Sequence, residues 1–197
     1  MVKGTDDLSK EIMRTARQLF ERDGVEAVSM HKVAKTLGIG QGTLYRRYPN
    51  KGNLCFCIME ARFEEFKAGI YDYLLAHAAS ASVMEKLAAV MRMIIQIMHE
   101  DLAWIRAVTH TDKLEEARSN LFELPPCVFL RETIQRLLEE AAEAGQLRPL
   151  DPAFTASLMI SSLRPELIIH LEEQGYQAEQ IADHFIATLV EPLFEAV

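Results

Sequence analysis

Five residues between positions 41 and 46 could bring a helix against the base edges and phosphates of a nucleic acid, four of them through their side chains and one, a glycine, through its backbone. Arg46 offers a planar fork of donors that can pair with two acceptors at once, on a guanine edge or on a phosphate. Gln41 can pair with adenine in the same two-point manner. The hydroxyls of Thr43 and Tyr45 suit phosphate oxygens, and Gly42 lets the backbone approach closely. The alternative interpretation is an ordinary helix face in contact with solvent.

A short helix over 41–48 would present these side chains together. If Leu44 and Tyr48 form its inward pair, the helical repeat turns the five polar positions away from the core. Pro49 ends the helix, because proline cannot continue the hydrogen-bond ladder and disfavours helical backbone at the residue before it.

A second short helix must precede this one. Ser29 can cap its start with a side-chain oxygen, and Gly38 can end it in the left-handed conformation that glycine adopts without penalty. Between them, apolar residues fall on one face at helical spacing: Met30, Val33, Ala34 and Leu37. Two helices joined by a short turn that contains glycine form a helix-turn-helix, here over about 29–48.

The run Thr43–Lys51, reading TLYRRYPNK, follows Val33-Ala34 and Gly38-Ile39 at a spacing that resembles the DNA-binding domain of the tetracycline-repressor (TetR) family. The upstream stripe of Ile12, Ala16, Leu19 and Phe20, with Gly24 and Val28 behind it, fits the same domain. This resemblance covers about the first quarter of the chain. It implies an all-α fold, with a three-helix DNA-binding domain followed by a helical domain for ligand binding and dimerisation.

The resemblance also implies roles for individual residues. The helix 41–48 would be the recognition helix, with Gln41, Gly42, Thr43, Tyr45 and Arg46 facing DNA. Ser29, Tyr48 and Lys51 would contact phosphate. Two glycines depart from the family pattern: Gly40 replaces a frequent hydroxyl cap, and Gly52 replaces a more usual acidic residue.

Lys51 follows Asn50, a good N-cap, and so falls in the first turn of the next helix. Free N–H groups and the helix dipole attract phosphate there, and a cation adds to that attraction. A Lys side chain that is merely solvated is the alternative.

Charge divides the chain in two. Residues 1–52 hold ten Lys/Arg and six Asp/Glu, a net +4, whereas residues 53–197 hold eleven and twenty-three, a net −12. The positive part is the one that carries the helix-turn-helix, as binding to phosphates requires. We therefore predict a DNA-binding domain over 1–52 and a helical effector-binding and dimerisation domain over 53–197.

Composition limits the remaining possibilities. No run of eighteen apolar residues is present, and the N-terminus MVKGTDDLSKE lacks an apolar signal core, so a cytoplasmic protein is expected. Three cysteines fit reduced thiols, with a redox-sensing thiol as the alternative. Cys55 and Cys57 point to different helix faces, so a shared metal is not expected. Catalytic, cofactor and metal-ligand patterns were not found in the sequence, and neither an enzyme nor a cofactor is predicted.

After Asn50 the pattern is helical throughout. We expect helices over about 51–77, 83–99, 102–108, 127–144, 152–174 and 178–196, with a loop at 120–126. Pro165 should kink or interrupt its helix near 161–163.

The family's body encloses a pocket for a small effector, and methionines suit adaptable apolar cavities. Met84, Met91 and Met98 recur every seven residues on the central helix. The candidate pocket residues are Met91, Met98, Trp104, Phe122, Phe129 and Met159. Ordinary core packing is the alternative, and the effector cannot be named from the sequence.

The last two helices carry more apolar area than one small body needs, notably Phe154, Leu158, Leu163, Ile181, Phe185, Ile186, Leu189, Leu193 and Phe194. In the TetR family these helices pair into a four-helix bundle between subunits, and an internal core pair is the alternative. The sequence thus predicts a homodimeric, sequence-specific repressor of a palindromic double-stranded DNA operator, released by a small apolar or amphipathic effector. The alternatives are a helical module that binds protein without DNA, or an enzyme.

Overall fold

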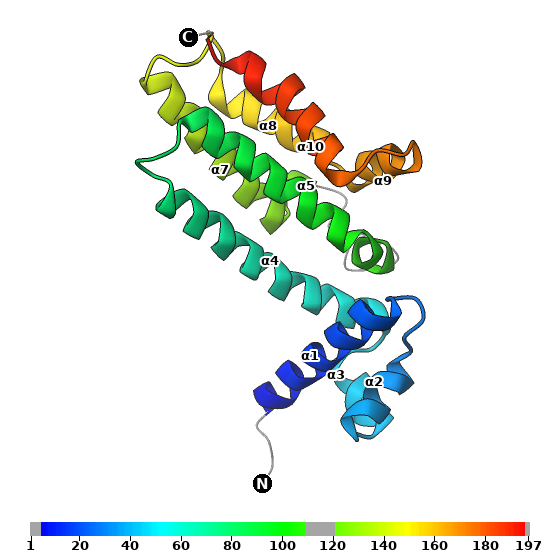
Figure 1. Ribbon diagram of the computed structural model, residues 1–197. Coiled ribbons are helices and arrows are strands. Elements are labelled where there is room, and N and C mark those ends of the chain that lie inside the picture. The colour runs from blue at the N-terminus through cyan, green and yellow to red at the C-terminus, as the bar shows by residue number, and fades with distance from the viewer. Residues whose placement is uncertain (1–4, 109–120, 196–197) are drawn as a thin grey trace. The chain divides into compact units, whose positions relative to one another are not determined.

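The computed structural model describes residues 5–108 and 121–195 (Figure 1). Within these ranges the regular structure is helical, apart from an isolated bridge between Leu147 and Phe194, so the predicted all-α class is confirmed. No helix in the described ranges combines the length and apolar character that crossing a membrane needs. The chain divides into two compact units. The N-terminal unit is Met1–Glu64 with Ala103–Arg118, and the body is Glu65–Leu102 with Ser119–Val197.

The N-terminal unit is built from α1 (Thr5–Asp23), α2 (Met30–Leu37), α3 (Gln41–Arg47) and the first half of α4 (Lys51–Ala76). Its core is the apolar stripe seen in the sequence, closed by residues of α4. The buried members are Ile12, Ala16, Leu19, Phe20, Val25, Val28, Met30, Val33, Ala34, Leu44, Tyr48, Leu54, Cys55, Ile58 and Trp104.

This unit extends further than the division at residue 52 that we drew from the sequence. Leu54 and Cys55 are fully buried and Ile58 nearly so, all on α4, where they cover the inner sides of the preceding helices. A unit as small as α1–α3 buries too little apolar surface alone, so the first turns of α4 complete its core.

The turn between α2 and α3 is fixed by local caps. The Ser29 hydroxyl accepts the backbone N–H of Lys32 at 3.2 Å, which satisfies one of the free donors of the first turn. Gly38 takes a φ of 67°, and the N–H of Ile39 then reaches back to the carbonyl of Ala34 at 3.0 Å. Both predicted caps are confirmed.

The body consists of the second half of α4, α5 (Val83–Val108) as far as Leu102, a 3-10 turn Leu121–Glu123, α7 (Pro125–Glu143), α8 (Pro152–Ser162), α9 (Pro165–Glu173) and α10 (Ala178–Phe185). α7 packs along α8 (Figure 1). A π-helical turn Ile186–Val190 and a 3-10 turn Glu191–Leu193 extend α10. The most buried helix is α5, as predicted: Leu87, Val90, Met91, Ile94 and Ile95 are almost inaccessible to solvent.

The structure differs from two of the predicted helix boundaries and confirms one predicted interruption. The helices 83–99 and 102–108 are one helix, α5, because the polar run 99–101 contains no Gly or Pro to stop it. The predicted interruption of the helix 152–174 near 161–163 is confirmed: α8 ends at Ser162 and α9 begins at Pro165, because Pro165 forces Arg164 into extended backbone. The regular part of the last helix ends at Phe185 rather than near 196, and its continuation loosens into wider and tighter turns before Pro192.

Candidate nucleic-acid interface

α3 presents the polar face that the sequence predicted. Gln41, Gly42, Tyr45 and Arg46 are exposed and Thr43 is half-buried. On the opposite side, Leu44 is fully buried and Tyr48 nearly so. The helix is therefore anchored through its inner side and leaves a row of donors and acceptors in solvent. The contact of these side chains with DNA stays a prediction.

Tyr48 is held in the core rather than at the surface. It is almost completely buried, and its hydroxyl shares a side-chain hydrogen bond with Ser9 of α1. Burial raises the pKa of Tyr48 above its ordinary value. This position gives Tyr48 a role in fixing the end of α3 against α1, and it leaves little of the side chain for the expected phosphate contact.

The ammonium group of Lys51 is directed at the backbone that connects α1 to α2. Its Nζ donates to the carbonyls of Val25 at 2.9 Å, Glu26 at 3.2 Å and Val28 at 3.3 Å. An ammonium has three donors, and these three acceptors can use all of them. Lys51 therefore ties the start of α4 to the segment before α2, a contact that differs from the phosphate contact expected from the sequence.

We expect Lys51→Met to destabilise the N-terminal unit by about 1–3 kcal/mol, the usual range for hydrogen bonds to a charged group. Chemical denaturation followed by circular dichroism would measure the loss. Lys35→Met, at an exposed position of α2, is the matched control and should change stability little. An unchanged stability together with a salt dependence of DNA binding that falls by about one unit would instead place Lys51 on a phosphate.

Ser29 is compatible with both a structural and a binding role. Its oxygen accepts the N–H of Lys32, as a cap should. A hydroxyl that accepts one bond still has its own proton to donate. Ser29 is exposed at the start of α2, so a phosphate contact through that proton stays a prediction.

Asp23 organises the charges at the end of α1. Its carboxylate receives hydrogen bonds from Arg22 at 2.8 Å and from Lys32 Nζ at 2.7 Å. The hydrogen bond from Arg22, followed by that from Lys32, holds the pKa of Asp23 well below its usual range. Two of the unit's cations are thus paired with Asp23, whereas Lys35 and Arg46 lie exposed on α2 and α3.

α2 and α3 also meet through polar side chains. Gln41 Nε2 lies 2.5 Å from Nδ1 of His31, and both residues are exposed. The sequence interpretation gave His31 no role. Its position one residue after the start of α2 was visible in the sequence, but its contact with Gln41 depends on the angle at which the two helices cross.

The candidate effector residues do not form one group. Met91 and Met159 are buried in the core of the body, Met98 and Phe129 pack against it half-buried, and Phe122 is exposed. Trp104 belongs to the core of the N-terminal unit, where its ring meets Phe20 edge to face at 5.2 Å. Trp104 therefore lies in a different core from Met91, Met98, Phe129 and Met159, because α5 continues past residue 102.

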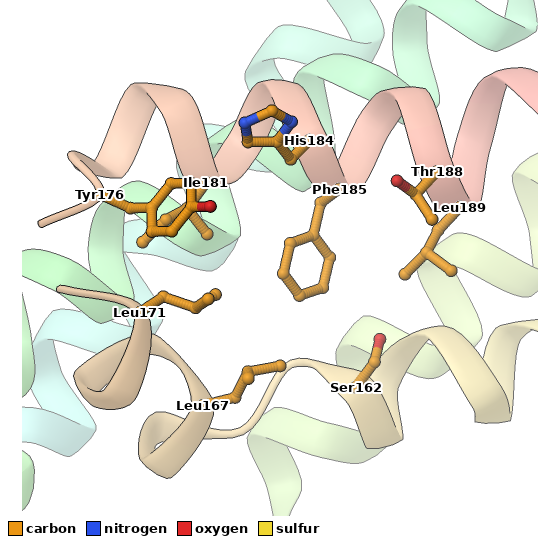
Figure 2. A pocket seen from close by; sticks show the side chains of 9 residues that line it. All are labelled: Ser162, Leu167, Leu171, Tyr176, Ile181, His184, Phe185, Thr188 and Leu189. Carbon is orange, nitrogen blue, oxygen red and sulfur yellow. The ribbon is translucent and has the colours of Figure 1, made fainter. Parts of the chain in front are cut away.

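The body has an open pocket of about 460 Å³ that the sequence did not suggest (Figure 2). Its lining is mainly apolar and comes from the end of α8, from α9 and from α10 with its π-helical extension: Ser162, Leu167, Leu171, Tyr176, Ile181, His184, Phe185, Thr188 and Leu189. None of the six candidate effector residues is among them. The pocket exists because the chain turns at Pro165 and brings α9 opposite α10 (Figure 2); the sequence predicted a kink or interruption there, but not the direction in which the chain turns.

The thiols of Cys55 and Cys127 are poorly suited to redox sensing. Cys55 is buried in the core of the N-terminal unit, and burial raises its pKa to about 11. Burial also raises the pKa of Cys127. The thiolate is the reactive form. Because burial raises both pKa values, only a small fraction of either thiol is ionised at neutral pH.

The family model described as "Bacterial regulatory proteins, tetR family" matches residues 12–56. An HTH-type transcriptional regulator of Staphylococcus aureus is 41% identical over 66 residues, which are 34% of this chain and 36% of that protein. The chain thus matches only about a third of the length of this curated relative.

Solved structures extend the likeness of fold to the whole chain. A transcriptional regulator from Saccharomonospora viridis in complex with choline has a TM-score of 0.70 at 16% identity and covers 98% of this chain and 100% of its own. The regulator FadR of Bacillus subtilis in complex with stearoyl-CoA has a TM-score of 0.67 at 18% identity and covers 93% and 98%. The helix-turn-helix part of this chain, residues 12–56, thus belongs to the tetR family of bacterial regulatory proteins, and the whole chain shares the fold of the regulators named above.

Proposed function

We propose that this protein is a cytoplasmic, homodimeric repressor that binds a palindromic DNA operator and leaves it when a small apolar or amphipathic effector binds the body. The observation that carries the proposal is the exposed polar face of α3, held on a rigid helix-turn-helix by the buried Leu44 and Tyr48. A helix anchored in this way can enter the major groove with its donors and acceptors facing base edges.

The direct test is selection of binding sites from random duplex DNA, followed by mobility-shift titration of the selected duplex. We expect two related half-sites whose centres lie about one helical turn, or a multiple of it, apart. Equal affinity for all sequences would contradict the proposal and favour a module that binds protein.

Arg46→Ala is expected to weaken binding to the selected operator by about 1–3 kcal/mol and to relax the preference at one base pair of each half-site. Arg46→Lys is the informative control, because it keeps the charge but loses the planar fork. If Arg46 contacts a base, the Arg46→Lys variant should be little more specific than Arg46→Ala. Equal losses on operator and random DNA would assign Arg46 to a phosphate.

Dimerisation is supported by an apolar surface on α8. Phe154 is 64% exposed and Leu158 is 55% exposed, one turn apart on the same side of the helix. At the other end of α8, Ser162 lines the pocket described above together with residues of α10 (Figure 2). By contrast, Ile181, Phe185, Ile186 and Phe194 are buried within the chain itself. The proposed interface therefore rests on fewer residues than the sequence suggested.

Control by an effector is supported by the fold and by two relatives of that fold, whose structures contain choline and stearoyl-CoA. The proposed effector site lies among the buried Met91 and Met159 and the half-buried Met98 and Phe129. Flexible thioethers there could rearrange to admit an apolar molecule. Both α4 and α5 have residues in each unit. Each helix therefore connects the body, where the effector is proposed to bind, with the N-terminal unit that carries α3. Such a ligand must prefer the conformation that does not bind DNA, since equal affinity for both would change nothing.

A further inference from the structure

The hydrogen bond between α2 and α3 joins a side chain that faces DNA in the proposed function to one that does not belong to the recognition helix. His31 is the second residue of α2 and Gln41 the first of α3. The turn between them is fixed by Gly38 and by the backbone bond from Ile39 to Ala34. The two side chains are therefore brought together by a rigid backbone and meet at Gln41 Nε2 and His31 Nδ1.

The chemistry of the two groups determines which atom donates. An amide nitrogen is only a donor, so in this contact Nδ1 of His31 acts as the acceptor, which is the role it has in the tautomer with the ring proton on Nε2. The Gln41 amide has two N–H groups and one carbonyl. One N–H donates to His31. The positions of the other N–H, a donor, and of the carbonyl, an acceptor, are then fixed, and both groups face a partner in solvent.

This order matters because a free glutamine amide can rotate by half a turn and exchange its donor with its acceptor. Adenine presents an acceptor, N7, beside a donor, the N6 amino group, and it needs the amide in one orientation. A rotating amide can satisfy other base edges as well, and ordering it on binding costs conformational entropy.

We propose that His31 is a positioning residue that fixes the orientation of the Gln41 amide and so makes Gln41 selective for adenine in the operator half-site. The inference rests on the proposed function, because it requires Gln41 to face DNA. His31 acts through Gln41, and its own contact with DNA is not needed.

The test compares wild-type protein with His31→Phe and His31→Asn. Phe keeps a ring but has no acceptor, whereas Asn has an oxygen that can occupy the place of Nδ1. On the duplex selected by wild-type protein, we expect His31→Phe to lose about two- to tenfold in affinity, the range for one ordered side chain. The preference for an A·T pair at a single position should flatten. Affinity for random DNA should stay unchanged, and His31→Asn should restore the preference.

A double-mutant cycle with Gln41→Ala separates positioning from direct contact. If His31 acts through Gln41, His31→Phe should have no further effect once Gln41 is Ala. His31→Ala, the second variant without an acceptor, carries the same expectation should the Phe variant fail to fold. An equal loss in both backgrounds would overturn the proposal and make His31 itself a DNA contact. An unchanged profile for His31→Phe on a duplex that wild-type protein selects would overturn it too. Failure of wild-type protein to select any sequence would overturn the proposed function along with it.

Discussion

Leu158→Glu is expected to convert the protein from a dimer to a monomer and to lower its affinity for a palindromic operator about 100- to 10,000-fold. Leu158 and Phe154 are the exposed apolar pair on α8, and a carboxylate placed between two copies would have to lose its hydration without a partner. A monomer holds one half-site only, so it loses the effective concentration that ties the second recognition helix to DNA. Light scattering would report the mass, and titration of full and half operators would report affinity.

Leu75→Glu is the matched control for this substitution. Leu75 lies on α4 and is 79% exposed, so it is an even more accessible leucine, but it lies on a different helix from the proposed interface. We expect this variant to remain dimeric with wild-type operator affinity. If both variants stay dimeric at micromolar concentration, α8 is not the interface. A monomeric Leu158→Glu protein with unchanged operator affinity would contradict the two-fold binding mode.

The helix-turn-helix could be predicted from the sequence because its determinants are local. Ser29, Gly38 and Pro49 set the ends of two helices through backbone geometry that depends on the residue type alone. The apolar spacing of Val33 and Leu44 then fixes which sides face inward. The outward face of α3 follows from these two facts, which is why its exposed residues were placed correctly.

The roles of Lys51 and Trp104 could not be predicted, since they depend on residues far away in the chain. Lys51 binds carbonyls about twenty-five residues earlier in the chain, and the spacing of residues in the sequence does not predict such a contact. Trp104 packs on Phe20 only because α5 continues past its polar run. Likewise, the pocket between α9 and α10 requires knowing how far Pro165 turns the chain, whereas the sequence indicates only that a turn or kink occurs there.

Met91→Ala should decide whether the centre of the body is packed or hollow, and we expect it to destabilise the body by about 2–5 kcal/mol. Met91 is fully buried in the same core cluster as Leu87, Ile94 and Ile95. Removing a large side chain from a close-packed core loses both the transfer free energy of its atoms and the contacts around the cavity left behind. Urea denaturation followed by circular dichroism would measure the change.

Met84→Ala provides the comparison on the same helix, because Met84 is 37% exposed at the start of α5 and its truncation should have a much smaller effect. Operator affinity of folded Met91→Ala protein without ligand should stay near that of wild type, since Met91 belongs to the body and α3 to the other unit. Affinity for an apolar effector should change, because the substitution widens the space among the methionines. A stability loss as small as that of Met84→Ala would contradict the packed core and indicate that Met91 already lines a cavity. In a packed core, an effector must open its own space by moving Met91, Met98 and Met159, and that rearrangement is the change that α4 and α5 could carry to the N-terminal unit.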